Sequence, residues 1–379
     1  MSDPTILISA GEASGDLYAA ALTAALRRRW PEAEFFGCAG PRMAAAGVEQ
    51  VVDAGQLSVV GLAEVVRDIP RIYGEFRELA AEAERRQPRL AVLTDSPSFH
   101  LRLAKKLKRH GIPVIYLVAP QIWAWKKWRV RQVRRDVDLL LCIFPFEEQF
   151  FRGHGVKAVY IGHPLTRIIR PRYAKGAFLA KHGIPRDRPL LVLLPGSRAG
   201  EAARHLSLLA EAADRLHRDR PAAFILAAPP GAVSGRGPSF WEPISRSPIK
   251  IIEGETWDAI AHADLALAAS GTVTVEAALL GTPMVTFYRV SEITWLLGRL
   301  LVDVPFYSMV NLIAGRQGVP EIMQHNLTGA RLAHEAALLL GDGSACGEMK
   351  RGLSEVAGRL AVAEDPLERA ADLIEGFLK

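Results

Sequence analysis

The stretch LLVLLPGSRAGEAARHL, from Leu190 to Leu206, joins an apolar run to a turn of Pro-Gly-Ser-Arg and then to a helix-like segment. An uninterrupted apolar run predicts a strand buried on both faces, which is typical of parallel sheets. A turn of small residues before a helix leaves backbone N–H groups free, where anions are favoured. The stretch therefore predicts an α/β fold and raises the question of which ligand the turn holds.

Similar apolar runs alternate with helix-like segments along the whole chain. They begin at Thr5, Glu34, Leu90, Val114, Leu139 and Ala158 in the first half, and at Leu190, Ala223, Ile249, Leu265 and Met284 in the second. The order strand, helix, strand predicts parallel sheets. Because these runs are too many for one comfortable sheet, we expect two Rossmann-like domains facing each other across a cleft.

The stretch GHPLTRIIRPRYAKG, Gly162 to Gly176, is basic, proline-containing and weakly periodic, which favours a domain boundary. We expect an N-terminal domain of residues 1–165 and a C-terminal domain of residues 166–359. The helical tail from about Ala345 to Lys379 fits either domain on its pattern, and we assign its last helix, about residues 360–379, to the N-terminal domain. The stretch PPGAVSGRGPSFWEP, Pro229 to Pro243, predicts a long loop.

The composition limits the function classes. The chain has 379 residues, a formal net charge of +6 and three scattered cysteines. These predict free thiols in a reducing compartment rather than a disulfide or a zinc site. Neither an apolar span of about 18 residues nor a basic N-terminal leader is present, so we expect no transmembrane helix and no signal peptide. The positive charge suits nucleic acid, anionic lipid or phosphorylated small molecules.

Three predicted strands end in small-residue turns that open helices: ISAGEASGD, LPGSR and AASGTVTVEAALLGTP. None of them contains Gly-x-Gly-x-x-Gly or the Gly-Lys-Ser/Thr of a phosphate-binding loop. The pattern therefore argues against a dinucleotide oxidoreductase and a P-loop nucleotide hydrolase.

The two turns of the second half suit a sugar nucleotide. Their backbone N–H groups favour a diphosphate, to which Arg198 adds a planar fork. Glu276 lies one helical turn after Thr272 and can accept hydrogen bonds from a ribose diol. Plain helix capping, with a first-turn acid, is the alternative. The predicted donor-binding residues of these turns are Gly196, Ser197, Arg198, Ser270, Gly271, Thr272 and Glu276.

Ten motifs together resemble the lipid-A-disaccharide synthases, from Thr5 to the final helix. In order they are SAGEASGDLYAA, GCAGPRMAAAGVE, SVVGLAEVV, LTDSPSFHLRLAK, PQIWAWKKWRV, FPFEEQFF, GHPL, LPGSRAGE, SGTVTVEAALLGTPMVTFYR and VPEIMQ. The resemblance implies a glycosyltransferase-B fold with a C-terminal helix that crosses back to the first domain. It also implies an inverting transfer of 2,3-diacylglucosamine from UDP to the 6-hydroxyl of 2,3-diacylglucosamine 1-phosphate, forming a β-1,6 link.

The resemblance implies no cofactor and no metal. The Asp-x-Asp of metal-dependent glycosyltransferases follows none of the predicted strands, and DVD at Asp136 precedes one. In such a site, helix N-termini and Arg198 would neutralise the departing UDP.

Asp95 is our candidate for the general base, because an inverting transfer needs a group that takes the acceptor proton. It ends the run LAVLT and matches the first Asp of the family's Asp-x-Pro-Asp-Phe. A helix cap before Pro97 is the alternative. Ser98 stands where the family usually has the second Asp. His100 stands where it often has Asn, and predicts either help in proton transfer or a surface or capping histidine.

Glu12 is expected near the cleft, where it would orient the acceptor sugar or replace Asp95 as the base. Asp16 either contacts substrate or braces the turn, and His163 either touches the donor or makes a structural hydrogen bond. The glycines of this turn would allow a ligand to approach the backbone closely. The further substrate-binding residues predicted in this domain are Gly11, Ser14, Gly15, Asp16 and His163.

The segment SMVNLIAGRQGVPEIMQ, Ser308 to Gln324, supplies two more candidates. By resemblance, Asn311 and Glu321 would contact the donor sugar or the uridine. Val310 replaces a proline that the family usually has, which would loosen the loop without removing Asn311.

Two stretches suit a membrane surface, since both expected substrates carry acyl chains. VGLAEVVRDIPRIYGEFREL, from Val60, places apolar residues at helical spacing, with Pro70 breaking or kinking the helix. QIWAWKKWRVRQVRR, from Gln121, mixes tryptophans with cations, which favour anionic lipid. A buried helix face and an RNA site are the alternatives, but no single-strand-binding motif supports RNA, so we expect no nucleic acid. The predicted membrane residues are Leu62, Val65, Val66, Ile69, Trp123, Trp125, Lys126, Lys127 and Trp128.

These features predict a peripheral enzyme on the cytoplasmic face of a bacterial inner membrane, and a homodimer is compatible with the sequence. Two alternatives stay open. One is another UDP-GlcNAc-using enzyme of the same fold, a peptidoglycan glycosyltransferase or a 2-epimerase. The other is a non-catalytic lipid- or nucleotide-binding relative.

Overall fold

The computed structural model describes residues 4–57 and 62–378. The chain forms two compact units. The first unit holds the chain up to Arg167 together with Leu301–Asp303 and the segment from Leu360, and the second unit holds Ile168–Leu300 and Val304–Arg359.

The first unit contains a parallel sheet of seven strands in the order β3-β2-β1-β4-β5-β6-β7. The strands are β1 (Thr5–Ala10), β2 (Glu34–Ala39), β3 (Glu49–Asp53), β4 (Leu90–Thr94), β5 (Val114–Leu117), β6 (Leu139–Cys142) and β7 (Ala158–Tyr160). Every residue of β4, β5 and β6 is buried, as the uninterrupted apolar runs predict. The edge strand β3 has two exposed polar residues at its start, so its sequence carries no such run.

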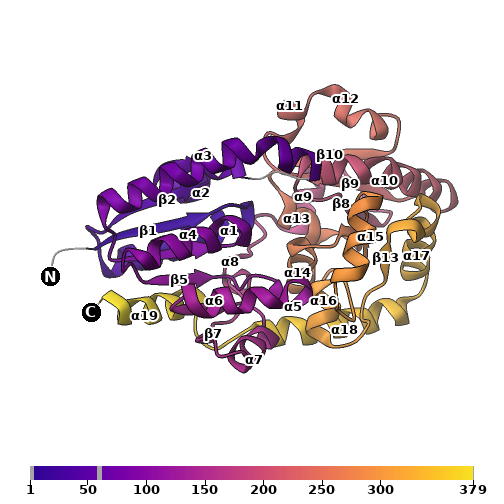
Figure 1. The fold of residues 1–379 in the computed structure, drawn as a ribbon. Helices are drawn as coiled ribbons and strands as arrows, with labels where there is room; N and C mark the ends of the chain where they lie inside the picture. The colour runs from indigo at the N-terminus through magenta and orange to yellow at the C-terminus, as the bar shows by residue number, and fades with distance from the viewer. Residues whose placement is uncertain (1–3, 58–61, 379) are drawn as a thin grey trace. The chain divides into compact units, whose positions relative to one another are not determined.

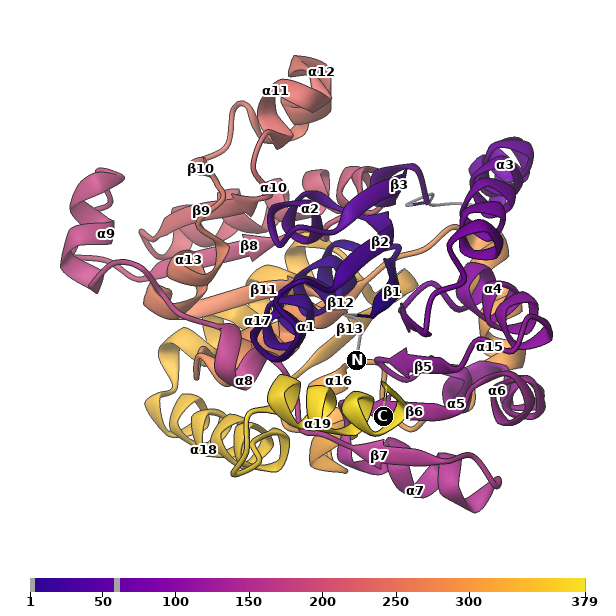
Figure 2. The same cartoon turned by 90° about the vertical axis from the view of Figure 1, so that its left-hand side faces the viewer.

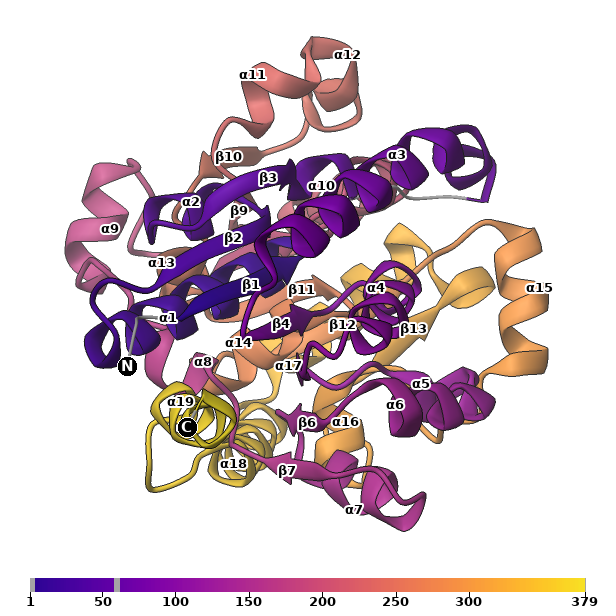
Figure 3. The ribbon, with the colours of Figure 1, turned by 60° about the vertical axis from the view of Figure 1, so that its left-hand side comes forward.

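Helices cover both faces of this sheet. They are α1 (Ala13–Arg29), α2 (Pro41–Ala45), α3 (Leu62–Arg86), α4 (Pro97–Arg109), α5 (Ile122–Trp125), α6 (Val130–Asp136), α7 (Pro145–Gly153), α8 (Leu165–Ile168) and α19 (Pro366–Leu378), with 3-10 turns η1 (Ala54–Leu57) and η2 (Lys127–Arg129). Figures 2 and 3 show α1 and α19 on one face and α3, α4 and α6 on the other. Helix α3 continues through Pro70, so the predicted break is wrong: the proline removes one backbone donor without ending the helix.

The C-terminal helix α19 returns to the first unit and packs against α1 (Figure 1). Arg29 of α1 forms ion pairs with Asp372 at 2.6 Å and with Glu368 at 3.0 Å. This confirms the crossing-back helix that the family resemblance implied.

The second unit contains a parallel sheet of six strands in the order β10-β9-β8-β11-β12-β13. The strands are β8 (Leu190–Leu194), β9 (Ala223–Ala228), β10 (Ile249–Glu253), β11 (Leu265–Ala269), β12 (Met284–Tyr288) and β13 (Glu321–Met323). The two halves of the chain therefore build one Rossmann-like sheet each, which confirms the predicted fold class.

The helices of the second unit include long and very short segments. They are α9 (Lys175–Lys181), α10 (Ala199–Asp219), α11 (Ala232–Arg236), α12 (Pro238–Trp241), α13 (Thr256–His262), α14 (Thr272–Leu279), α15 (Glu292–Leu301), α16 (Met309–Ala314), α17 (Gly329–Gly341) and α18 (Gly343–Leu360), with 3-10 turns η3 (Glu242–Ile244) and η4 (Gln324–Asn326). Helices α11 and α12 occupy the stretch predicted as a long loop. That prediction is wrong because Gly237, at φ +71°, separates two short helices, and Trp241 and Ile244 are buried.

Both sheets have a switch point, where the strand order reverses direction. In the first unit β1 pairs with β4, and in the second β8 pairs with β11. Ligands of open α/β sheets bind beyond the carboxyl ends of the strands at this point. Within the described residues, no helix has the length and apolar character needed to cross a bilayer.

Candidate functional site

The carboxyl edge of the first unit brings Asp95, after β4, against the start of α1, after β1. Its Oδ1 accepts a hydrogen bond from the Gly11 N–H at 2.8 Å, and its Oδ2 accepts one from the Glu12 N–H at 3.1 Å. Glu12 is the N-cap of α1, so the carboxylate lies at the positive end of that helix. The switch point therefore unites two of the predicted residues, Asp95 and Glu12, and both are partly exposed.

The glycines of the first turn make room for this carboxylate. A Cβ added at Gly15 would lie 1.7 Å from Asp95 Oδ2, and one at Gly11 would lie 2.3 Å from Ser96 Oγ. The close approach that these glycines permit is thus to the same chain, not to a ligand as predicted. Ser14, between them, is partly exposed and stays a candidate for substrate contact.

The backbone at this edge is strained. Asp95 has φ +54° and Ser96 has φ +38°, and Val118, directly after β5, has φ +67°. Non-glycine residues seldom adopt this left-handed region, and those that do concentrate at functional sites. These three strained residues follow two adjacent strands, β4 and β5, beside the Asp95 carboxylate; Gln87, before β4, and Gln324, after β13, also have positive φ. This edge is therefore the candidate site of the first unit.

Two buried side chains contact the Asp95 carbonyl, and a third, Ser9, contacts one of them. The Asp95 carbonyl oxygen is 3.0 Å from His100 Nδ1 and also accepts a hydrogen bond from the Tyr116 hydroxyl. A carbonyl only accepts, so His100 Nδ1 carries the hydrogen, and Nε2 accepts from the Ser9 hydroxyl at 2.7 Å. His100 is fully buried, so the prediction of a surface histidine is wrong: its ring contacts Ser9 of β1 and the Asp95 carbonyl just after β4.

Burial governs the protonation of these groups. It raises the pKa of Asp95 well above its ordinary value, and the charge of Glu12 adds to this, while the amides of Gly11 and Glu12 oppose it. Burial lowers the pKa of His100 to about 4, so the ring is neutral near pH 7.

Two predicted substrate residues of the first unit have roles inside the protein. The buried Asp16 accepts hydrogen bonds, each of 3.0 Å, from the N–H groups of Gly40, Arg42 and Met43. It therefore caps α2, which is the bracing role that the sequence also allowed, and the substrate contact stays a prediction.

His163 is also buried and bonded within its own chain, and the donor contact stays a prediction. Its Nδ1 accepts from the Leu165 N–H at 3.2 Å, and its ring packs against Tyr18 and Phe144. Burial lowers the pKa of His163 to about 3. The structural hydrogen bond, the alternative offered by the sequence, is the one found.

In the second unit, the two predicted anion-binding turns follow neighbouring strands. Leu194 of β8 pairs with Ala268 of β11, so the turn after β8 lies beside the turn after β11 at the switch point. Helix α10 follows the first turn and helix α14 follows the second. Ser197, Gly271 and Thr272, at these helix starts, are exposed. This arrangement presents two helix starts to solvent at one place.

The first of these turns depends on Gly196 and Glu201. Gly196 has φ +111°, and a Cβ there would lie 2.4 Å from the carboxyl carbon of Glu201. Burial raises the pKa of Glu201, while the charge of Arg198 opposes the shift. The Glu201 side chain thus folds against the turn and fills the space beside Gly196.

His205, which the sequence analysis did not single out, ties this turn to the end of β12. Its Nδ1 donates to the Pro195 carbonyl at 2.7 Å, and its Nε2 accepts from the Arg289 N–H at 3.1 Å. The ring is fully buried. The only signal in the sequence was a histidine on the apolar side of a predicted helix, directly before Leu206.

The second turn is supported by residues predicted to touch the donor. The Ser270 hydroxyl donates to the Tyr307 carbonyl at 2.8 Å, and Glu321 accepts from the N–H groups of Tyr307 and Ser308, both at 2.9 Å. Glu321 also accepts from Asn311 Nδ2 at 2.7 Å. Glu321 therefore holds the start of α16 and the segment on which Ser270 rests.

Asn311 uses both of its side-chain polar atoms within the chain. Its Oδ1 accepts from the N–H groups of Gly318 and Val319 at 2.8 and 3.0 Å, and Nδ2 also donates to the Val319 carbonyl at 3.0 Å. Asn311 is fully buried and bonded within its own chain, and the donor contact stays a prediction. Among the described residues, no three His, Cys, Asp or Glu side chains are grouped as a metal site.

The predicted membrane residues separate into buried and exposed ones. Trp123 is buried, its Nε1 donates to Glu147 Oε1 at 3.2 Å, and its ring packs edge-on against Phe146, so its predicted place at a membrane surface is wrong. Trp125 and Trp128 are 42% and 68% exposed. Lys126 Nζ lies 3.6 Å from the centre of the Trp125 ring.

The other predicted membrane residues are described in part. Lys127 pairs with Asp303 at 2.8 Å, and Ile69 of α3 is 53% exposed. The side chains of Leu62, Val65 and Val66 lie outside what the structure describes, as do residues 58–61 of the motif SVVGLAEVV.

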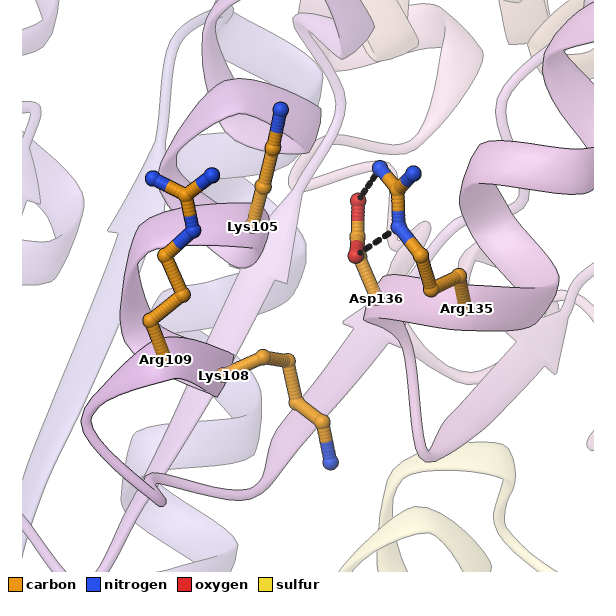
Figure 4. Close-up of a pocket in the computed structure, with 5 residues that line it drawn as sticks. All are labelled: Lys105, Lys108, Arg109, Arg135 and Asp136. Atoms are coloured by element: carbon orange, nitrogen blue, oxygen red, sulfur yellow. Dashed lines mark hydrogen bonds and ion pairs between the residues drawn. The ribbon is translucent and has the colours of Figure 1, made fainter.

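A separate cationic cluster lies between α4 and α6. Figure 4 shows Lys105, Lys108 and Arg109 of α4 opposite Arg135 and Asp136 of α6, around a cavity of about 400 Å³. Arg135 pairs with Asp136 at 2.7 Å, and Lys108 pairs with Asp138 at 2.6 Å. Both helices end here, just before β5 and β6 begin. The cluster is thus at the amino edge of the sheet, opposite Asp95.

Comparisons with known proteins agree with this architecture. The family model LpxB, lipid-A-disaccharide synthetase, matches residues 6–358. A lipid-A-disaccharide synthase of Solibacter usitatus (strain Ellin6076) is 58% identical over 99% of this chain and 98% of its own length. One of Myxococcus xanthus (strain DK1622) is 44% identical over 98% and 97%.

Solved structures share the fold at low sequence identity. The UDP-GlcNAc 2-epimerase from Neisseria meningitidis bound to UDP-GlcNAc is 12% identical, with a TM-score of 0.64 over 99% of both chains. The calicheamicin glycosyltransferase CalG4 is 16% identical, with a TM-score of 0.61 over 100% of this chain and 99% of its own. With two Rossmann-like units and relatives of this identity along its whole length, the chain belongs to the lipid-A-disaccharide synthase family, the glycosyltransferases of lipid A biosynthesis.

Proposed function

We propose that this chain transfers 2,3-diacylglucosamine from UDP to the 6-hydroxyl group of 2,3-diacylglucosamine 1-phosphate, giving the β-1,6-linked disaccharide 1-phosphate and UDP. Family membership supports the reaction. The residue roles are supported by the groups that lie at the two switch points. One holds a carboxylate at a helix start, and the other holds two adjacent helix starts that favour an anion.

In this proposal the second unit binds the donor. The turn Gly196–Arg198 and the start of α14 at Gly271 and Thr272 offer backbone N–H groups to the diphosphate, and Arg198 adds its guanidinium. Ser270 shapes the second turn, since its N–H donates to the Phe287 carbonyl at 2.8 Å. Glu276, one turn into α14, accepts the ribose hydroxyls. As the glycosidic bond breaks, its electron pair goes to the diphosphate, and these donors stabilise the growing negative charge.

The first unit binds the acceptor, with Asp95 as the general base. The acceptor oxygen attacks the anomeric carbon from the face opposite UDP, and Asp95 takes the hydroxyl proton. A raised pKa makes the carboxylate a better proton acceptor near neutral pH. Glu12, at the same edge, orients the sugar, and its negative charge contributes to the raised pKa of Asp95.

The test is a transfer assay with mass-tagged donor and acceptor. We expect a disaccharide 1-phosphate and UDP in equal amounts, and Asp95→Asn should lower kcat about 10³-fold. Asp187→Asn, an exposed carboxylate in the second unit, is the control. Release of a free epimerised sugar would instead indicate an epimerase, and full activity of Asp95→Asn would remove Asp95 as the base.

We further propose an anionic membrane surface as the partner, with the enzyme peripheral on the cytoplasmic face of the inner membrane. Support comes from the exposed rings of Trp125 and Trp128, the adjacent Lys126, and the exposed Ile69 and Tyr73 on α3. A homodimer is part of the same proposal, and sedimentation of the purified chain measures it directly.

A further inference from the structure

We infer that His100 and Tyr116 are positioning residues, which hold the Asp95 peptide in the left-handed conformation that its carboxylate requires. The inference rests on the proposed role of Asp95 as the base. It assigns a function to His100, which stands where the family often has asparagine.

The Asp95 residue is held at two ends. Its carboxylate is held by the N–H groups of Gly11 and Glu12, and its carbonyl oxygen by His100 Nδ1 and the Tyr116 hydroxyl. His100 comes from α4 and Tyr116 from β5, so two elements fix one carbonyl. Both side chains are fully buried, which makes each hydrogen bond costly to lose.

The held conformation is an unfavourable one. Asp95 at φ +54° and Ser96 at φ +38° both lie in the left-handed region, which non-glycine residues adopt only at a cost in free energy. If the carbonyl were released, this peptide could relax toward negative φ. Rotation about that bond also turns the Cα–Cβ direction, so the carboxylate would leave the start of α1.

His100 itself is oriented by Ser9. The Ser9 hydroxyl donates to Nε2 at 2.7 Å, which leaves the hydrogen on Nδ1, facing the Asp95 carbonyl at 3.0 Å. The Asp95 carbonyl oxygen thus accepts a hydrogen bond from one defined tautomer of the neutral His100 ring. Ser9 lies in β1, beside β4, so the alignment is set by the sheet itself.

Two replacements of His100 separate positioning from packing. In His100→Asn the amide nitrogen can take the place of Nδ1 and still donate to Asp95, but the contact with Ser9 is lost. In His100→Gln the amide reaches the place of Nε2 and keeps Ser9, but the donor to Asp95 is lost. Each variant loses one buried hydrogen bond, so a purely structural role predicts similar thermal stability and similar activity for both.

We expect His100→Asn to keep kcat within about threefold of the parent and His100→Gln to lower it about tenfold, the size of one hydrogen bond. KM for both substrates should change less than about twofold in each. Tyr116→Phe should behave like His100→Gln. Tyr160→Phe, which also removes a hydroxyl bonded to a backbone carbonyl at 3.2 Å, should leave kcat unchanged.

A nitrogen-15 NMR spectrum of the histidines gives a readout independent of activity, with His100 expected as the Nδ1–H tautomer. Equal kcat in the Asn and Gln variants, or an Nε2–H tautomer, would overturn the positioning role. An active Asp95→Asn would instead overturn the proposed base, so the two failures are distinct.

Discussion

The two switch points have the same strand topology but differ in which residue type takes the left-handed backbone conformation. At the first, non-glycine residues Asp95 and Ser96 are forced into the left-handed region, and buried side chains hold the Asp95 carbonyl there. At the second, a glycine, Gly196, takes the unusual conformation freely and the turn stays exposed. The difference suits the proposed roles: a general base requires a carboxylate in one fixed position, whereas a diphosphate site requires accessible backbone N–H groups.

The largest expected effect comes from Gly15→Ala, which crowds the first switch point. The new Cβ would lie 1.7 Å from Asp95 Oδ2, the movable end of a side chain, so the carboxylate shifts while the fold survives. We expect kcat to fall about 10³-fold, with UDP binding unchanged by calorimetry. Gly74→Ala, with no atom within 4 Å of the added carbon, is the control. A normal kcat would show that the carboxylate position does not matter.

The next effect concerns pH and the buried Glu147 of the first unit. Burial raises its pKa from 4.5 to about 8, so between these values the folded state binds more protons than the unfolded state. The free energy of unfolding should therefore fall as pH rises, by about 1.4 kcal/mol per pH unit, or about 3 kcal/mol from pH 5 to pH 7.

Glu147→Gln should remove the contribution of Glu147 and make the slope shallower, while the raised pKa values of Asp95 and Glu201 act on parent and variant alike. Urea unfolding of both proteins at several pH values measures the difference. Glu148→Gln, the neighbouring and more exposed carboxylate of α7, should keep the slope. If the pH dependence of the parent and that of the Glu147→Gln variant coincide, Glu147 is ionised in the folded protein at neutral pH.

Gly196→Ala tests the second switch point. The residue would have to hold φ +111° with its Cβ 2.4 Å from the Glu201 carboxyl carbon. We expect UDP to bind about tenfold more weakly, because the turn must change shape. Gly343→Ala, which has open space around the added carbon, serves for comparison. Unchanged UDP affinity would separate this turn from the donor site.

The smallest effect is expected at the surface. Ile69→Asp should lower binding to vesicles of anionic phospholipid about fivefold, since an exposed apolar side chain becomes charged. Leu338→Asp in the second unit is a close match, because Ile69 and Leu338 are both 53% exposed. Equal binding of the two variants in a flotation assay would argue against α3 as a membrane contact.

Much of the fold could be predicted from the sequence because each strand that is buried on both faces is a short, uninterrupted run of apolar residues. The runs at Leu90, Val114 and Leu190 became β4, β5 and β8. The edge strands β3 and β13 were missed because β3 is partly polar and β13 is only three residues long. Helices α11 and α12 were missed because glycine and proline within a short stretch also fit a loop.

The candidate site divides in the same way. Local sequence patterns were enough to identify the turns that end the strands at the switch points, since apolar runs and small-residue turns are both short-range features. The folded chain was needed to establish which polar groups are already in use. Asp16, His163 and Asn311 were predicted as ligand contacts but are bound by their own chain, and His205 gave no clear signal yet joins two strand ends. The reason is that a hydrogen-bond partner is set by residues far away along the chain, and no local pattern carries that information.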